Sequence, residues 1–131
     1  MSPEQIALVR SSWSQVLPMR TTIADLFYSK LFELDPRLRP LFKNDMAHQG
    51  EKLIDMLDAA VNGLGKPQAI ESSLKHLGQR HARYGASEGD YDTVAASLIW
   101  TLEQGLGDAF TPDVRQAWAQ AYATLIALMH N

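Results

Sequence analysis

The sequence has no cysteine among its 131 residues. This absence excludes disulfides, zinc–thiolate sites, iron–sulfur clusters and thiolate nucleophiles. Neither sign of charge dominates, since 12 Lys and Arg face 15 Asp and Glu for a net charge of −3. Nucleic acid and anionic membrane surfaces are therefore not expected as partners. The sequence also lacks a membrane-length apolar run and a signal-like N-terminus, so we expect a cytoplasmic protein with no membrane span.

The chain also lacks internal repeats, low-complexity tracts and linker-like segments. A length of 131 residues suits one domain of ordinary size, which can bury roughly two-thirds of the surface that its unfolded chain exposes. We therefore expect a single domain over residues 1–131 that folds around its own hydrophobic core. The sequence leaves its oligomeric state open between a monomer and a small homo-oligomer.

The positions of proline and glycine divide the chain into segments of helical length. Ser2 with Pro3 and Gln5 is typical of a capped helix start, and a helix is expected to end before Pro36. Residues 62–67 are expected to end one helix and begin the next. At residues 111–112 a threonine followed by proline is again typical of a capped helix start. Between these marks the apolar residues recur every three or four positions, not every two. The sequence predicts an all-α fold.

Two of the expected helices carry polar residues on apolar stripes. In residues 47–64, Gln49 leads a stripe that continues through Leu53, whereas His48 falls on the opposite face. In residues 68–84, His81 completes a stripe that includes Leu77, whereas His76 falls on a solvated face. Periodicity alone does not separate a ligand from an ordinary residue here. A histidine in this position is either a hydrogen-bonded core residue or a metal ligand, and Gln49 is either a boundary residue or a ligand contact.

Three other patterns have ordinary structural interpretations. Residues 85–89 satisfy G-x-S-x-G, but a nucleophile elbow needs a strand before it, and here the pattern joins two helices. Asp55 and Asp58 are expected on a solvated helix face. Gly50, early in its helix, predicts a close approach to the preceding helix near the small Ala24.

Separated motifs across most of the chain together resemble the globin family. They occupy residues 34–42, 57–61, 77–81, 91–94 and 110–122. Within that family the chain is similar to bacterial single-domain haemoglobins, to the haem domain of flavohaemoglobins and to neuroglobin. The resemblance implies a globin fold, a three-over-three helical sandwich around haem b. It also implies that His81 is the axial ligand of the haem iron.

The resemblance assigns further residues to the pocket. It implies that Tyr28, Gln49 and Leu53 lie on the side where the gas binds, with Tyr28 and Gln49 as hydrogen-bond donors. Two such donors suit a polarised diatomic ligand such as dioxygen, and each is expected to slow its release about ten- to a hundredfold. The remaining implied cofactor contacts are Phe42, Lys52, Leu77, Tyr91 and Val94, with Lys52 reaching a haem propionate.

The sequence departs from the flavohaemoglobin pattern in two ways. Tyr91 matches a tyrosine beside the axial histidine, but the glutamate that accompanies it in those proteins is missing from the last helix. Strong electron donation to the iron is therefore not expected. No FAD- and NAD-binding module follows in the sequence, so any turnover would require a separate reductase.

Three functions follow from the resemblance. The chain is expected to bind dioxygen, and also NO and CO, reversibly and with high affinity for storage or delivery. One alternative is an enzyme, a nitric oxide dioxygenase that takes electrons from the separate reductase. A second alternative is a haem-based gas or redox sensor, although no output domain follows the globin-like sequence.

Overall fold

The structure is a computed structural model that describes residues 1–42, 45–66, 68, 70–72, 74–76, 79 and 88–130. Its long helices are α1 (Pro3–Val16), α2 (Arg20–Leu34), α3 (Met46–Asn62), α5 (Glu88–Leu106) and α6 (Pro112–His130). Short 3-10 helices η1 (Leu17–Met19), η2 (Pro36–Leu41) and η4 (Gly107–Ala109) connect some of them. No strand occurs in these residues, which confirms the all-α prediction.

Helix boundaries follow the local chemistry of the sequence. Ser2 caps α1 in a full capping box, because its hydroxyl accepts from the Gln5 amide while the Gln5 side chain accepts from the Ser2 amide. The second long helix ends at Leu34, two residues before Pro36, as predicted. At the start of α6 the hydroxyl of Thr111 accepts from the backbone amide of Val114.

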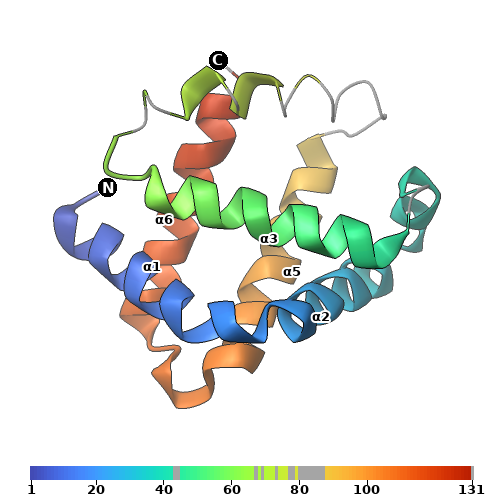
Figure 1. The fold of residues 1–131 in the computed structure, drawn as a ribbon, viewed down its shortest axis with the longest axis horizontal. Coiled ribbons are helices and arrows are strands. Elements are labelled where there is room, and N and C mark those ends of the chain that lie inside the picture. Colours follow the sequence, from blue (N-terminus) through green and yellow to red (C-terminus); the bar gives the residue numbers. More distant parts are fainter. Residues whose placement is uncertain are drawn as a thin grey trace.

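The helices cross one another at steep angles rather than running as a parallel bundle. In Figure 1, α3 runs across the middle of the molecule, with α5 and α6 crossing behind it. The first helix packs against α6, and α2 packs against both α3 and α5. None of the described helices is long and apolar enough to cross a membrane.

A tryptophan pair marks the contact between α1 and α6. The rings of Trp13 and Trp118 meet edge to face, with centroids 6.1 Å apart. Both indole N–H groups are satisfied, since Trp118 donates to the buried Ser12 hydroxyl at 2.8 Å and Trp13 donates to Asp58 at 2.9 Å. Asp58 is therefore half-buried, because the buried indole of Trp13 requires an acceptor. The prediction that Asp58 lies on a solvated face is wrong. Asp55 is exposed and pairs with Arg20.

The predicted close approach of α2 and α3 is confirmed at Gly50. A Cβ placed on this glycine would lie 3.0 Å from the Cβ of Ala24, closer than side chains normally approach. Gly50 is buried, as are Ile54 and Val61 further along α3. Together with the buried Leu57 and Ala60, these residues form the face of α3 that packs into the core. The predicted stripe through Gln49 and Leu53 is only partly buried, because it borders a pocket.

Candidate ligand pocket

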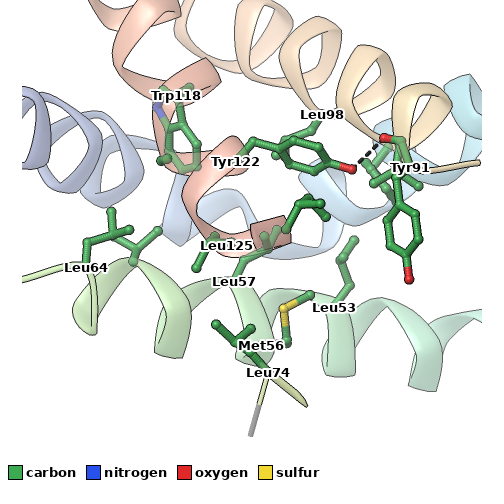
Figure 2. Close-up of a pocket in the computed structure, with 15 residues that line it drawn as sticks. Leu53, Met56, Leu57, Leu64, Leu74, Tyr91, Leu98, Trp118, Tyr122 and Leu125 are labelled. Atoms are coloured by element: carbon green, nitrogen blue, oxygen red, sulfur yellow. Dashed lines mark hydrogen bonds between the residues drawn. The ribbon is translucent and has the colours of Figure 1, made fainter. Parts of the chain in front are cut away.

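A pocket lies between α3 on one side and α5 with α6 on the other (Figure 2). It encloses about 830 Å³ of space free of protein atoms, its open mouth included. The described residues that line it are Phe27, Leu53, Met56, Leu57, Val61, Leu64, Leu74, Tyr91, Val94, Leu98, Trp118, Ala121, Tyr122, Leu125 and Ile126.

Helical spacing explains why these side chains meet. Met56 and Leu57 lie three and four residues after Leu53, so all three project from the same side of α3. Figure 2 shows them facing Trp118 and Leu125 of α6 across the pocket. Trp118, Ala121 and Leu125 recur at three- and four-residue intervals on α6 and supply the opposite wall. Apolar residues at helical spacing on α3 and α6 therefore face each other and line one apolar cavity.

The polar atoms on the pocket wall are already engaged. The Tyr122 hydroxyl donates to the backbone carbonyl of Tyr91 at 2.5 Å, joining α6 to the start of α5 (Figure 2). Burial raises the pKa of Tyr122 far above its usual value, with smaller contributions from Tyr91 and Asp92. Burial, followed by the charge of Asp90, also raises the pKa of Tyr91. Both phenols are therefore neutral at ordinary pH, and the cavity presents a largely apolar surface.

A second group of predicted residues converges where α2, η2 and α3 meet. The Tyr28 hydroxyl lies 3.5 Å from the backbone carbonyl oxygen of Gln49, to which it donates a long hydrogen bond. The ring of Phe42, just after η2, meets the Tyr28 ring edge to face with centroids 5.4 Å apart. Burial raises the pKa of Tyr28 to about 12. The structure thus brings Tyr28, Phe42 and Gln49 together.

The other predicted site residues fall into three groups. Leu53, Tyr91 and Val94 line the pocket. Lys52 is exposed on α3, one residue before Leu53. Leu77 and His81 lie outside the described residues, so their predicted roles stay predictions. Tyr28, Phe42 and Gln49 are not among the lining residues, although Phe27 and Leu53 are their neighbours on α2 and α3.

The described lining of the pocket suits a flat, apolar macrocycle. It offers aliphatic and aromatic carbon, and the half-buried Tyr122 hydroxyl on its wall already has an acceptor. A porphyrin would therefore not leave the Tyr122 hydroxyl unpaired. The phenol of Tyr28 and the amide of Gln49, both part-buried, supply donors close to Leu53. The chemistry of the described residues is compatible with haem.

Sequence reasoning missed several wall residues. Phe27, Met56, Trp118 and Tyr122 line the pocket but are not among the site residues that the sequence predicts. Spacing contained part of the signal, because Trp118 and Tyr122 stand four residues apart on α6. What periodicity could not reveal is which apolar face meets another helix and which borders a cavity.

Comparisons with known proteins agree with this architecture. The family model for Globin matches residues 25–129. Neuroglobin of Tetraodon nigroviridis is 29% identical over 143 residues, which cover 98% of this chain and 90% of that protein. Neuroglobin of Danio rerio is 28% identical with the same coverage.

A solved structure is similar over nearly the whole chain. It is an engineered carbene transferase, described as a putative nitric oxide dioxygenase from Rhodothermus marinus. It is 30% identical, has a TM-score of 0.87, and the match covers 98% of this chain and 90% of that one. These matches confirm the predicted globin fold.

Proposed function

Since the chain belongs to the globin family, we propose that it binds haem b and holds dioxygen with high affinity, as an oxygen-binding, storage or delivery protein. Membership in the family implies haem and the reversible binding of gases such as dioxygen. When bound, haem supplies an iron atom that takes a diatomic gas. The finer assignments below concern what this chain's own residues do around that group.

The apolar wall is proposed to hold the macrocycle and exclude water. Leu53 and Val94 line the pocket from α3 and α5, and Phe42 is proposed to pack against one face of the ring. Lys52, exposed on α3, is proposed to pair with a propionate at the mouth. His81 is proposed as the residue that would hold the haem iron, because the resemblance to globins assigns it that role and it completes an apolar stripe in the sequence.

The observation that carries the oxygen-binding proposal is the position of the Tyr28 hydroxyl. Its hydrogen bond to the Gln49 carbonyl is long, at 3.5 Å, so most of its donor strength is uncommitted. With a pKa of about 12, the phenol keeps its proton at physiological pH. It is proposed to donate to the gas together with the Gln49 side-chain amide. A donor near charge that develops on a ligand in a dry site retains that ligand strongly.

One observation favours nitric oxide dioxygenation as a second candidate function. The similar solved structure is described as a putative nitric oxide dioxygenase. The reaction combines dioxygen and nitric oxide with one electron to form nitrate. A separate reductase is proposed to supply that electron.

An absorption spectrum tests the haem proposal directly. The purified chain, after reconstitution with haemin and reduction, is expected to show the spectrum of a histidine-ligated haem and a lasting complex with dioxygen. His81→Ala is expected to alter that spectrum strongly. His76→Ala is the matched control, because His76 is exposed and carries no proposed role. A chain that takes up no haemin would overturn the proposal, and so would a His81→Ala spectrum identical to that of the unaltered chain.

Steady-state nitric oxide consumption separates the two functions. The reduced protein in air is supplied with nitric oxide, with and without a ferredoxin or flavodoxin reductase as electron donor. A single burst equal to the haem concentration, even with the donor present, supports oxygen binding. Many turnovers that require the donor support the dioxygenase.

A further inference from the structure

Tyr28 lies against aromatic rings on several sides. Phe27 meets it edge to face with centroids 5.2 Å apart, and Phe42 does so at 5.4 Å. Phe32, one helical turn further along α2, stacks on it at 6.0 Å with an interplanar angle of only 24°. Three rings therefore bound this phenol, whereas its hydroxyl end points to the α3 backbone at Gln49.

The hydrogen bond of Tyr28 is too weak to orient the ring. At 3.5 Å it lies at the outer limit of hydrogen-bond geometry, where attraction and directionality are both small. Ring contacts are closer to their preferred arrangements, since both edge-to-face and offset-stacked pairs fall within the favourable range of centroid distances. The orientation of the phenol is consequently set by its aromatic neighbours.

Phe32 has a special place among these neighbours. Its ring also meets Phe42 edge to face at 5.4 Å, so Tyr28, Phe32 and Phe42 form a closed triangle of rings. The Arg39 guanidinium of η2 lies 5.1 Å above the Phe32 ring, which adds a cation–π contact on the surface side. Phe32 thereby links the exposed η2 segment to the phenol.

We infer that Phe32 is a positioning residue, which holds the Tyr28 phenol in the orientation that donates to the gas. The inference rests on the proposed function of Tyr28. Phe32 is proposed to act through Tyr28, whose ring it contacts, and not on the gas itself. A leucine at this position would keep the side chain apolar but remove the flat surface on which the phenol stacks. The phenol would then sample orientations that point its hydroxyl away from the ligand.

A double-mutant cycle on the haem-loaded full-length chain tests this inference. Dioxygen dissociation is measured for the unaltered chain, Phe32→Leu, Tyr28→Phe and the double variant. Phe32→Leu is expected to speed dissociation roughly three- to tenfold, the value of one aromatic pair. In the Tyr28→Phe background the same change is expected to have almost no effect, because no hydroxyl remains to be positioned. An equal effect in both backgrounds would mean that Phe32 acts only through general packing, and would overturn the inference.

Two further variants sharpen the cycle. Phe32→Tyr keeps the ring and is expected to restore slow dissociation, whereas Phe32→Met lacks a ring and is expected to behave like Phe32→Leu. Phe110→Leu is the matched control, because it makes the same chemical change at a half-buried position between η4 and α6. This control is expected to leave dissociation unchanged. Phe32→Tyr behaving like Phe32→Leu would contradict a role for the ring.

A measurement without haem separates failure of this inference from failure of the proposed function. Carbon-13 labelling of tyrosine, with the Tyr28 signal assigned from Tyr28→Phe, reports the phenol pKa by NMR in the full chain. Phe32→Leu is expected to lower the pKa of Tyr28 from about 12 towards the ordinary value of 10.0, because loss of the ring admits water. If the chain binds no haem but the pKa of Tyr28 falls in Phe32→Leu, the proposed function is wrong, whereas the contact by which Phe32 positions Tyr28 is supported. An unchanged pKa would overturn the inference even if haem binds.

Discussion

Two tyrosines of this globin occupy half-buried positions at two different helix contacts, and their hydroxyls are used differently. Tyr122 on α6 donates to the Tyr91 carbonyl of α5 at 2.5 Å. Tyr28 on α2 reaches the Gln49 carbonyl of α3 at only 3.5 Å. Burial is the main cause that raises the pKa of each phenol. Their environments are thus similar, and the difference lies in the acceptor distance.

This difference means that the Tyr122 hydroxyl stabilises a helix contact, whereas the Tyr28 hydroxyl is available to a ligand. A short hydrogen bond in an apolar cavity stabilises the α5–α6 contact and leaves the Tyr122 hydroxyl no capacity to donate elsewhere. A long bond leaves the Tyr28 hydroxyl able to exchange its acceptor for a ligand at little loss. Aromatic packing replaces the missing bond as the feature that orients Tyr28. The following predictions test this contrast.

The largest effect is expected from Tyr28→Phe on gas binding. Removal of the hydroxyl is expected to accelerate dioxygen dissociation about ten- to a hundredfold, which corresponds to roughly 1–3 kcal/mol. Carbon monoxide dissociation is expected to change much less, because that ligand is less polar when bound. Stopped-flow displacement measures both rates. Unchanged dioxygen dissociation would show that the phenol does not contact the ligand.

Tyr122→Phe is expected to act on stability instead. It removes a short buried hydrogen bond between two helices and is expected to lower the free energy of unfolding by about 1–2 kcal/mol. Its effect on dioxygen dissociation is expected to be small. Urea denaturation of the haem-free chain measures the stability, with Tyr28→Phe as the matched variant expected to lose less. The contrast fails if the two substitutions destabilise the chain equally.

Raising the pH into the alkaline range is expected to lower the free energy of unfolding through both Tyr28 and Tyr122. Because folding raises the pKa of Tyr28 from 10.0 to about 12, the unfolded chain loses this proton first as the pH rises. Stability from this group is therefore fully present below about pH 10 and is lost as the pH rises towards about 12. Tyr122 contributes in the same direction. Denaturation from pH 8 to 11.5 is expected to show this decline, and a decline of equal size in the Tyr28→Phe, Tyr122→Phe double variant would assign it to other groups.

The smallest effect is expected at Gly50, where α2 and α3 meet beside the available phenol. Gly50→Ala adds a Cβ 3.0 Å from that of Ala24, and overpacking of about 1–3 kcal/mol opposes a helix-propensity gain of about 1 kcal/mol. We expect a net destabilisation of about 1 kcal/mol, the middle of a range from about 0 to 2 kcal/mol. Adding Ala24→Gly is expected to relieve the overpacking. Thermal unfolding measures both variants, and a Gly50→Ala loss that Ala24→Gly does not reduce would place the strain elsewhere.

Local features of the fold were predictable because their causes lie close together in sequence. The Ser2 cap, the end of α2 before Pro36 and the cap at Thr111 each depend on residues within a few positions. The approach of Gly50 to Ala24 was also predictable, because only a small residue on each helix permits it. Asp58 was misjudged, since its partner Trp13 lies 45 residues away.

The candidate site was predictable in part and for a different reason. The resemblance to globins singled out Tyr28, Phe42 and Gln49, and the structure brings these three together. Phe32 lies four residues after Tyr28 on the same helix, so their contact agrees with helical periodicity, although the sequence analysis did not single it out. The contacts of both rings with Phe42 join different elements and depend on how those elements cross, which a single sequence does not contain in readable form.

The sequence by itself determined that this chain is helical, where α1 and α6 begin and where α2 ends, and that it belongs to the globins. Helical periodicity and capping act over one or two turns, so they are legible without a structure. Only the tertiary structure decided that Tyr122 is bonded tightly while Tyr28 is held by rings. That outcome depends on distances of a few tenths of an ångström between helices far apart in the chain, which packing of the whole core sets.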